Sequence, residues 1–164
     1  LTIALWALQD LEGKGTSVNV GVVHGGTVCN TVPDTCTLQV DTRYWKDEDG
    51  KAVDEGIQAL CAKSWGDGIT VEAKQGSTSP AMPFTPATAE LVELVNRAAR
   101  EQGYEATWVD AGGGSDANRI AQIGTPVVDG VGPAGGGFHS AREYLMVETI
   151  ENRVRMLSRL LRYI

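Results

Sequence analysis

Two glycine-rich loops in the second half of the chain carry most of the residues that could do chemistry. The first covers residues 110–118 and contains Ser115, and the second covers residues 129–140 and contains His139, one of two histidines in the sequence. Both loops follow short apolar runs typical of buried strands, and α/β proteins bind ligands at the carboxyl ends of strands. A neutral imidazole there is a good metal ligand, and Glu143 is near enough to accept a hydrogen bond behind it. His139 is therefore the candidate metal ligand.

The first loop is also a candidate for anion binding. Its consecutive glycines Gly112, Gly113 and Gly114 precede a short helical run, so their backbone amides could form a nest for an anion or a carboxylate. A tight strand-to-helix turn that uses glycine at positive φ explains the same residues equally well. Taken alone, the loop leaves both interpretations open.

The second loop also matches the dinucleotide-binding pattern GxGxxG, through Gly130, Gly132 and Gly135. That pattern requires a helix that opens at the glycines and a parallel strand after the helix. Here Pro133 interrupts the loop, and only one helix is predicted after His139. A dinucleotide site is therefore not expected.

A serine hydrolase is the runner-up enzyme. Ser115, Asp129 and His139 occur in the chain order of an α/β-hydrolase triad. The sequence around Ser115 fits the nucleophile elbow only in part, because Ala117 replaces its last glycine. The three residues also span only 25 positions, which leaves little room for the separate loops of a triad.

The first 76 residues are predicted to form a small α+β domain. Its expected elements, in order, are a helix in residues 1–11, strands at 17–23 and 35–44, a helix at 51–64 and a strand at 69–73. No capping residue precedes Leu1, so residue 1 is interpreted as a cut site. One further strand before it would complete a split β-α-β-β-α-β sheet, the ferredoxin-like arrangement. His24, at a strand end, is expected to be an ordinary surface imidazole.

Alternation assigns the two faces of each predicted strand. In the second strand, Leu38, Val40 and Thr42 lie on one side, and Gln39, Asp41 and Arg43 lie on the other. In the first strand the pattern groups Val18, Val20 and Val22. We expect the apolar sides to face the helices.

Residues 77–86 contain Pro80, Pro83 and Pro86 among serines and threonines, which is typical of a linker. A second domain, residues 87–164, should open with a helix that Thr85 caps and Gly103 ends. Strands at 106–109 and 126–128, a helical run at 119–122 and a closing helix at 147–161 follow. Because two short strands cannot close a sheet, this region is expected to be a piece of a larger α/β sandwich.

Composition excludes several classes of partner. The chain has 164 residues, 42% of them apolar, with 14 basic against 21 acidic side chains and a net charge of -7. A negative chain without a basic cluster should attract neither nucleic acid nor an anionic membrane. No apolar run approaches the ~20 residues of a membrane span. Three cysteines without a CxxC pair favour a reducing compartment, and the cytoplasm is the expected location.

Several motifs together resemble one known family. They are Gly112-Gly-Gly-Ser-Asp-Ala, Thr125-Pro-Val-Val-Asp-Gly-Val-Gly-Pro, and Gly136-Gly-Phe-His-Ser-x-x-Glu-Tyr. Upstream, Gly25-Gly-Thr-Val-Cys-Asn-Thr-Val-Pro and Val40-Asp-Thr-Arg-Tyr continue the match in consistent order. This pattern resembles the zinc-dependent glutamate carboxypeptidase, aminoacylase and acetylornithine deacetylase family. The resemblance implies a lid, or dimerisation, domain followed by the end of an α/β zinc-exopeptidase catalytic domain.

The resemblance also implies roles for particular residues. His139 matches a ligand of a dizinc centre, and Asn30 and Arg43 match lid positions that hold substrate, often across a homodimer. Gly113, Gly114 and Ser115 match the loop beside the substrate carboxylate. Two of these have ordinary alternatives, because Asn30 suits a turn before Pro33 and Arg43 suits a solvated strand. An inward guanidinium at Arg43 would instead bind a carboxylate through two hydrogen bonds.

The implied activity is hydrolysis of amide bonds in small peptides or N-acyl amino acids that carry a free carboxylate. The other metal ligands and the catalytic glutamate of the family have no match in this sequence, so no residue here is assigned a catalytic role. A catalytic zinc usually has three protein ligands, and this chain alone is therefore predicted to be inactive. The non-enzyme alternative is a dimerising module that pairs through an exposed sheet edge.

Overall fold

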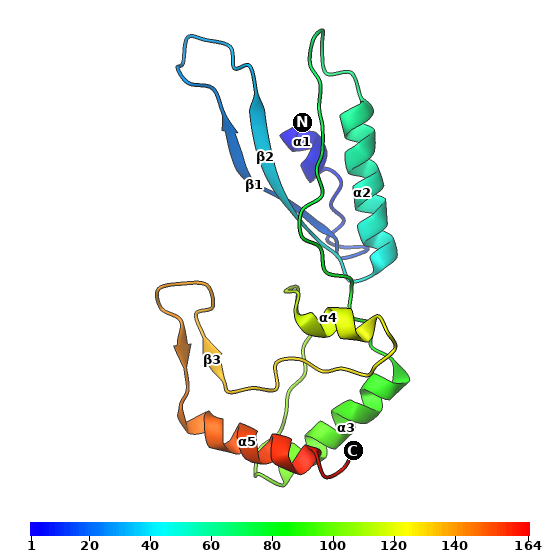
Figure 1. Cartoon of the computed structure of the whole chain (residues 1–164), viewed down its shortest axis with the longest axis vertical. Helices are drawn as coiled ribbons and strands as arrows, with labels where there is room; N and C mark the ends of the chain where they lie inside the picture. The colour runs from blue at the N-terminus through cyan, green and yellow to red at the C-terminus, as the bar shows by residue number, and fades with distance from the viewer. The chain divides into compact units, whose positions relative to one another are not determined.

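The computed structural model describes residues 1–164 and divides into two compact units, Leu1–Met82 and Pro83–Ile164 (Figure 1). The change from one unit to the next falls inside the proline-containing range 77–86. Neither unit contains a helix that combines the length and apolar character needed to cross a membrane.

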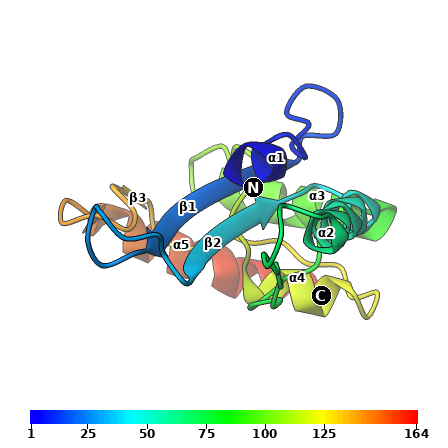
Figure 2. The same ribbon diagram turned by 90° about the horizontal axis from the view of Figure 1, so that it is seen from above.

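The first unit is an antiparallel hairpin with two helices. Strands β1 (Ser17–Gly25) and β2 (Cys36–Arg43) pair along their whole length, while α1 (Thr2–Trp6) contacts β1 and α2 (Asp47–Ala62) contacts β2 (Figure 2). The core of this unit is one buried residue from each of α1, β1 and α2, namely Leu5, Val18 and Val53. Helix-spaced and strand-spaced apolar residues therefore converge on one small cluster, as their periodicities predict.

A β-bulge at Gly21 changes the face assignment in β1. The register passes from Val20 opposite Val40 to Val22 opposite Gln39, which leaves Gly21 as the extra residue. Cross-strand partners share a face, so Val22 lies on the polar side with Gln39. The prediction that Val22 joins Val18 and Val20 is wrong, because a bulge shifts a two-residue period by one. The assignment in β2 is confirmed, since Leu38, Val40 and Thr42 are half-buried and their neighbours are exposed.

Both helices of the first unit differ in length from the sequence prediction. Helix α1 ends at Trp6 rather than near residue 11, because Asp10 turns the chain by bridging to Thr16 and accepting a hydrogen bond from Gly13 N. Helix α2 begins earlier, at Asp47. Three acidic residues occupy its first turn, where the helix dipole favours negative charge.

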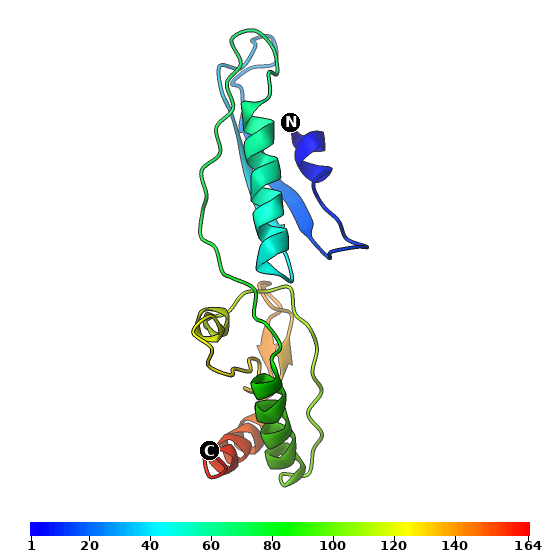
Figure 3. The ribbon, with the colours of Figure 1, turned by 90° about the vertical axis from the view of Figure 1, so that its right-hand side faces the viewer.

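The predicted strand at 69–73 does not form. The segment after α2 instead runs extended beside that helix (Figure 3), and side chains rather than a strand ladder hold its later part. Asp47 Oδ1 accepts from Ala81 N at 2.7 Å, and Tyr44 OH donates to Ser79 O at 3.1 Å. The unit therefore contains the helix-strand-strand-helix part of the ferredoxin-like pattern.

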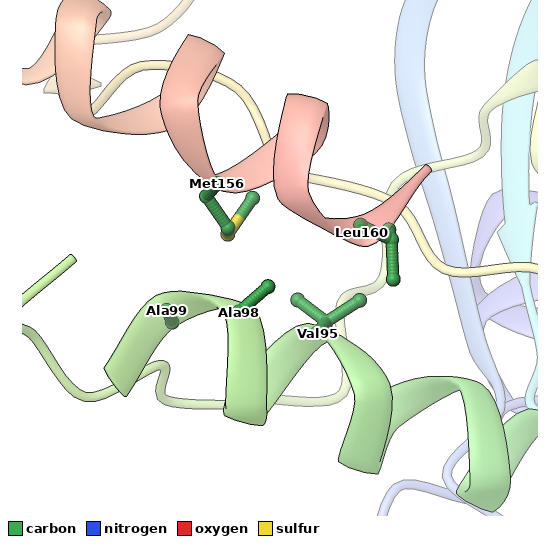
Figure 4. Packing of buried hydrophobic residues seen from close by; sticks show 5 residues of the cluster. All are labelled: Val95, Ala98, Ala99, Met156 and Leu160. Carbon is green, nitrogen blue, oxygen red and sulfur yellow. The ribbon is translucent and has the colours of Figure 1, made fainter. Parts of the chain in front are cut away.

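Two helices form the core of the second unit. Helix α3 (Pro86–Arg100) packs against α5 (Glu148–Leu160), and Val95, Ala98 and Ala99 meet Met156 and Leu160 (Figure 4). The two small alanines let the flexible Met156 side chain fill the space between the helices. The predicted N-cap is confirmed, because Thr85 Oγ1 accepts from Thr88 N at 3.1 Å.

A polar cluster joins the carboxyl-terminal parts of the same two helices. Glu101 accepts hydrogen bonds from the Tyr163 hydroxyl and from Arg159 Nε, while the Arg97 guanidinium lies 4.5 Å from the centre of the Tyr163 ring. The Tyr163 hydroxyl and then the Arg159 guanidinium lower the pKa of the Glu101 carboxyl below its usual value.

The rest of the second unit consists of short elements. Helix α4 spans Asp116–Ala121, and β3 (Gly135–Gly136) pairs with β4 (Tyr144–Leu145) in a small hairpin that the sequence analysis did not predict. Helix α4 also begins before the predicted run 119–122. The predicted strands at 106–109 and 126–128 are wrong, because neither segment has a neighbouring strand within the unit to complete its ladder. The predicted α/β class is nevertheless confirmed.

Candidate functional site

The first glycine-rich loop ends in a complete helix cap. Ser115 Oγ accepts a hydrogen bond from Ala117 N at 3.1 Å, and Asn118 Oδ1 accepts from Ser115 N at 2.8 Å. These reciprocal bonds form a capping box at the start of α4 and satisfy two backbone donors. Gly113 and Gly114 are exposed just before the cap, so their amides are accessible from solvent.

The cap determines what Ser115 can do. Its hydroxyl oxygen already accepts a backbone hydrogen bond, and no hydrogen bond joins Ser115 to Asp129 or His139. A nucleophilic serine needs a base within hydrogen-bond reach of its oxygen. The arrangement of these three residues therefore gives the serine hydrolase alternative no support.

The end of the second loop belongs to the β3–β4 connection, residues 137–143, which is held at both ends. Before it, Ala134 N donates to Thr149 Oγ1 of α5 at 2.9 Å, and after it Met146 N donates to Ala134 O at 2.9 Å. Inside the loop, Ser140 Oγ donates to Gly137 O at 2.6 Å. The loop that carries His139 is thus attached to α5, the last helix of its unit.

Two residues of the β3–β4 connection have left-handed backbone conformations. Gly137 has φ 69°, and a Cβ added there would lie 2.5 Å from Arg142 O, so glycine is required at that position. His139 has φ 60° and is the only non-glycine residue in the chain with positive φ. Such outliers cost free energy and frequently occur at functional sites.

The His139 imidazole is exposed and makes no hydrogen bond, whereas the His139 backbone N–H donates to Glu143 Oε2 at 3.2 Å. Glu143 was expected to accept a hydrogen bond from the His139 ring, but its carboxylate accepts from the main chain instead. Both ring nitrogens therefore remain available to a ligand.

A shallow hollow of about 280 Å³ lies beside the hairpin. Its walls come from the hairpin and the residues before it, namely Pro133, Ala134, Gly135, Phe138, Glu143, Tyr144 and Leu145. Phe138 and Tyr144 are largely exposed at its edge. This feature could not be found from the sequence, because Gly135 and Gly136 lack the β-branched or aromatic side chains that indicate a strand.

The two substrate-binding candidates of the first unit lie at opposite ends of its hairpin. Asn30 is in the loop between β1 and β2, whereas Arg43 is the last residue of β2 and pairs with Ser17. Seven residue steps separate Cys36 from Arg43, which corresponds to about 23 Å of strand. Arg43 lies on the exposed face, with Nε 2.8 Å from Asp41 Oδ2. One copy of the hairpin therefore cannot place both side chains on the same small molecule.

The chain contains no group of three or more His, Cys, Asp or Glu side chains placed to hold a metal ion. The His139 imidazole could supply one ligand, since it is exposed and makes no hydrogen bond.

The fold and these loops define a two-unit α/β protein whose candidate ligand side chain lies on a strained hairpin loop. The chain belongs to peptidase family M20/M25/M40, whose model matches residues 5–163. The resemblance seen in the sequence motifs is thereby confirmed.

Curated relatives agree with this assignment. Carboxypeptidase G2 of Pseudomonas sp. is 28% identical over 154 residues, which is 93% of this chain and 37% of the relative. Succinyl-diaminopimelate desuccinylase of Delftia acidovorans is 30% identical, covering 83% and 34%, and aminoacylase-1A of Rattus norvegicus is 31% identical, covering 71% and 28%. The chain spans roughly a third of the length of these relatives.

The fold also matches a solved structure, aminopeptidase PepT from Bacillus cereus ATCC 10987. The TM-score is 0.71 at 24% identity, covering 96% of this chain and 43% of that one. At this identity the likeness concerns the fold.

Proposed function

We propose that this chain is part of a metal-dependent hydrolase that cleaves amide bonds in small peptides or N-acyl amino acids with a free carboxylate. The observation that carries the proposal is the His139 imidazole, which is exposed and unpartnered on an anchored loop of a chain from peptidase family M20/M25/M40. The names of the relatives, a carboxypeptidase, a desuccinylase and an aminoacylase, all describe cleavage of an amide bond.

The proposed cofactor is a pair of zinc ions, with His139 as one of their ligands. Bound zinc would polarise the scissile carbonyl and lower the pKa of water. Three protein ligands are usual at a catalytic zinc, and this chain contains no group of three side chains placed to hold a metal. We therefore expect the chain by itself to be inactive, with the remaining ligands supplied by polypeptide beyond these residues.

The proposed organisation is a lid domain at 1–76 and the end of a catalytic domain at 87–164, joined by residues 77–86. In the second, Gly113, Gly114 and Ser115 would line the side of the substrate carboxylate. In the first, the separation of Asn30 from Arg43 supports a homodimer through the lid, because two copies can present opposite hairpin ends to different sites.

Zinc content and amide hydrolysis of the protein expressed from its full reading frame, with and without a chelator, test this proposal. We expect chelator-sensitive hydrolysis in that protein, loss of zinc and activity in His139→Ala, and retention of both in the control His24→Ala. This 164-residue chain should show neither activity nor stoichiometric zinc. Equal activity of the two histidine variants would refute the role of His139.

A dimerising module is the second candidate, and one observation favours it. The sheet of the first unit has only two strands, so β1 and β2 each have one edge without a partner strand, and such an edge can pair with a second copy. Sedimentation gives the oligomeric state of this chain. Together with the zinc assay, it distinguishes the hydrolase from the dimerising module. A dimer whose full reading frame binds no zinc would favour the module.

A further inference from the structure

The strained conformation of His139 requires an explanation, because most residues avoid it. An L-residue with φ near 60° brings its Cβ close to the following carbonyl, and only short polar residues and histidine tolerate this at moderate cost. The neighbouring left-handed residue of the loop is a glycine, for which the conformation is free of that strain. Something besides residue type must therefore hold His139 in place.

One side chain reaches the backbone of His139. Glu143 Oε2 accepts the hydrogen bond from His139 N at 3.2 Å, across a four-residue turn that ends where β4 begins. Two further bonds shape the turn, since Arg142 N donates to Ser140 Oγ at 3.2 Å and Glu143 N donates to Ser140 O at 3.1 Å. The carboxylate thus lies over the turn and fixes the amide plane that precedes the His139 Cα.

We infer that Glu143 is a positioning residue, whose carboxylate holds the left-handed backbone of His139 and thereby fixes the direction of its imidazole. A carboxylate behind a metal-binding histidine usually accepts from the ring N–H and selects the tautomer. Here the carboxylate accepts from the main chain. It determines where the ring points, while both ring nitrogens stay free. The functional meaning of that direction rests on the proposed function, but the positioning itself does not.

The test uses this 164-residue chain labelled for NMR, with Glu143→Ala, Glu143→Gln and the control Glu105→Ala. Glu105 is an exposed glutamate of the same unit that makes no hydrogen bond. The readouts are the amide exchange rate of His139 and its Cα and Cβ chemical shifts, which report its backbone conformation. Loss of general stability would change exchange throughout the unit, whereas loss of positioning changes these local signals.

We expect Glu143→Ala to raise the exchange rate of the His139 amide roughly tenfold to a hundredfold, the range for losing a hydrogen bond to a charged acceptor. The Cα and Cβ shifts should move away from left-handed values. Glu143→Gln keeps an acceptor oxygen and should restore most of both signals, and Glu105→Ala should change neither. Unchanged exchange and shifts in Glu143→Ala would overturn the inference, as would failure of Glu143→Gln to restore them.

A second measurement keeps the inference testable if Glu143→Ala loosens the whole hairpin. In a His139→Gly background the backbone has no steric strain at this position, so Glu143→Ala should lower the free energy of unfolding less there than in the wild-type background. Equal effects in the two backgrounds would contradict positioning through His139. Neither measurement involves zinc or hydrolysis, so failure of the proposed function would leave this result standing.

Discussion

The two glycine-rich loops of the second unit use their polar side chains in opposite ways. In the first loop, the Ser115 hydroxyl accepts a backbone hydrogen bond and so caps α4. In the second loop, the Glu143 carboxylate accepts the backbone hydrogen bond, and the His139 imidazole has no hydrogen-bond partner. A side chain that already accepts a backbone hydrogen bond is less available as a ligand. A side chain whose neighbouring backbone groups are bonded by another residue remains available.

The glycines of the two loops differ in the same way. Gly137 lies at φ 69° against the carbonyl of Arg142, so its position excludes a side chain. Gly113 does not have positive φ, and a Cβ added there meets nothing within 4 Å. One loop therefore depends on glycine for its shape, and at Gly113 the other does not.

The largest effect that would sharpen this comparison is expected for Gly137→Ala. Left-handed strain and the 2.5 Å approach of the new Cβ to Arg142 O should together lower the free energy of unfolding by about 2 kcal/mol or more. Chemical denaturation measures the change.

The matched control is Gly113→Ala, which should leave stability unchanged or raise it by roughly 0.4–1 kcal/mol, because alanine restricts the unfolded chain. If both substitutions destabilise the chain equally, the contrast between the loops is lost.

An intermediate effect is expected for Ser115→Ala. Removal of the capping oxygen leaves the Ala117 amide without its acceptor and should cost about 1 kcal/mol, whereas Ser115→Gly should cost only about a few tenths. Thermal unfolding of the two variants gives the comparison. An effect on zinc content of the full-length protein larger than that of His139→Ala would mean that Ser115 has a direct role that its cap geometry does not reveal.

Local patterns in the sequence predicted those parts of the fold that local interactions determine. Thr85 followed by Pro86 fixed the start of α3, and the alternation through Leu38 and Val40 fixed the faces of β2, since both signals act within a few residues. The bulge at Gly21 could not be predicted, because it depends on the register with β2. The expected strands at 69–73, 106–109 and 126–128 have strand-like composition, but a strand also needs a partner.

The candidate site shows the same division. His139 and Glu143 could be selected from spacing and residue type alone. The sequence could not indicate that Glu143 binds the main chain, because that contact follows from a left-handed turn between β3 and β4. The sequence also could not indicate that Asn30 and Arg43 lie far apart, because their distance depends on the length of the paired hairpin.

The smallest effect is expected at residue 139 itself. There the glycine variant should be more stable than the alanine variant, whereas at residue 113 alanine should be at least as stable as glycine. Alanine at φ 60° retains the strain of roughly 1–2 kcal/mol, whereas glycine removes it and gives up about 0.4–1 kcal/mol through the entropy of the unfolded chain. His139→Gly should therefore be more stable than His139→Ala by about 0.5 kcal/mol. Chemical denaturation measures this difference as a shift in midpoint, provided that the two variants have the same dependence of unfolding free energy on denaturant concentration. If alanine is the more stable at both positions, the left-handed conformation of His139 is not maintained in solution, and the imidazole has no fixed direction for Glu143 to hold.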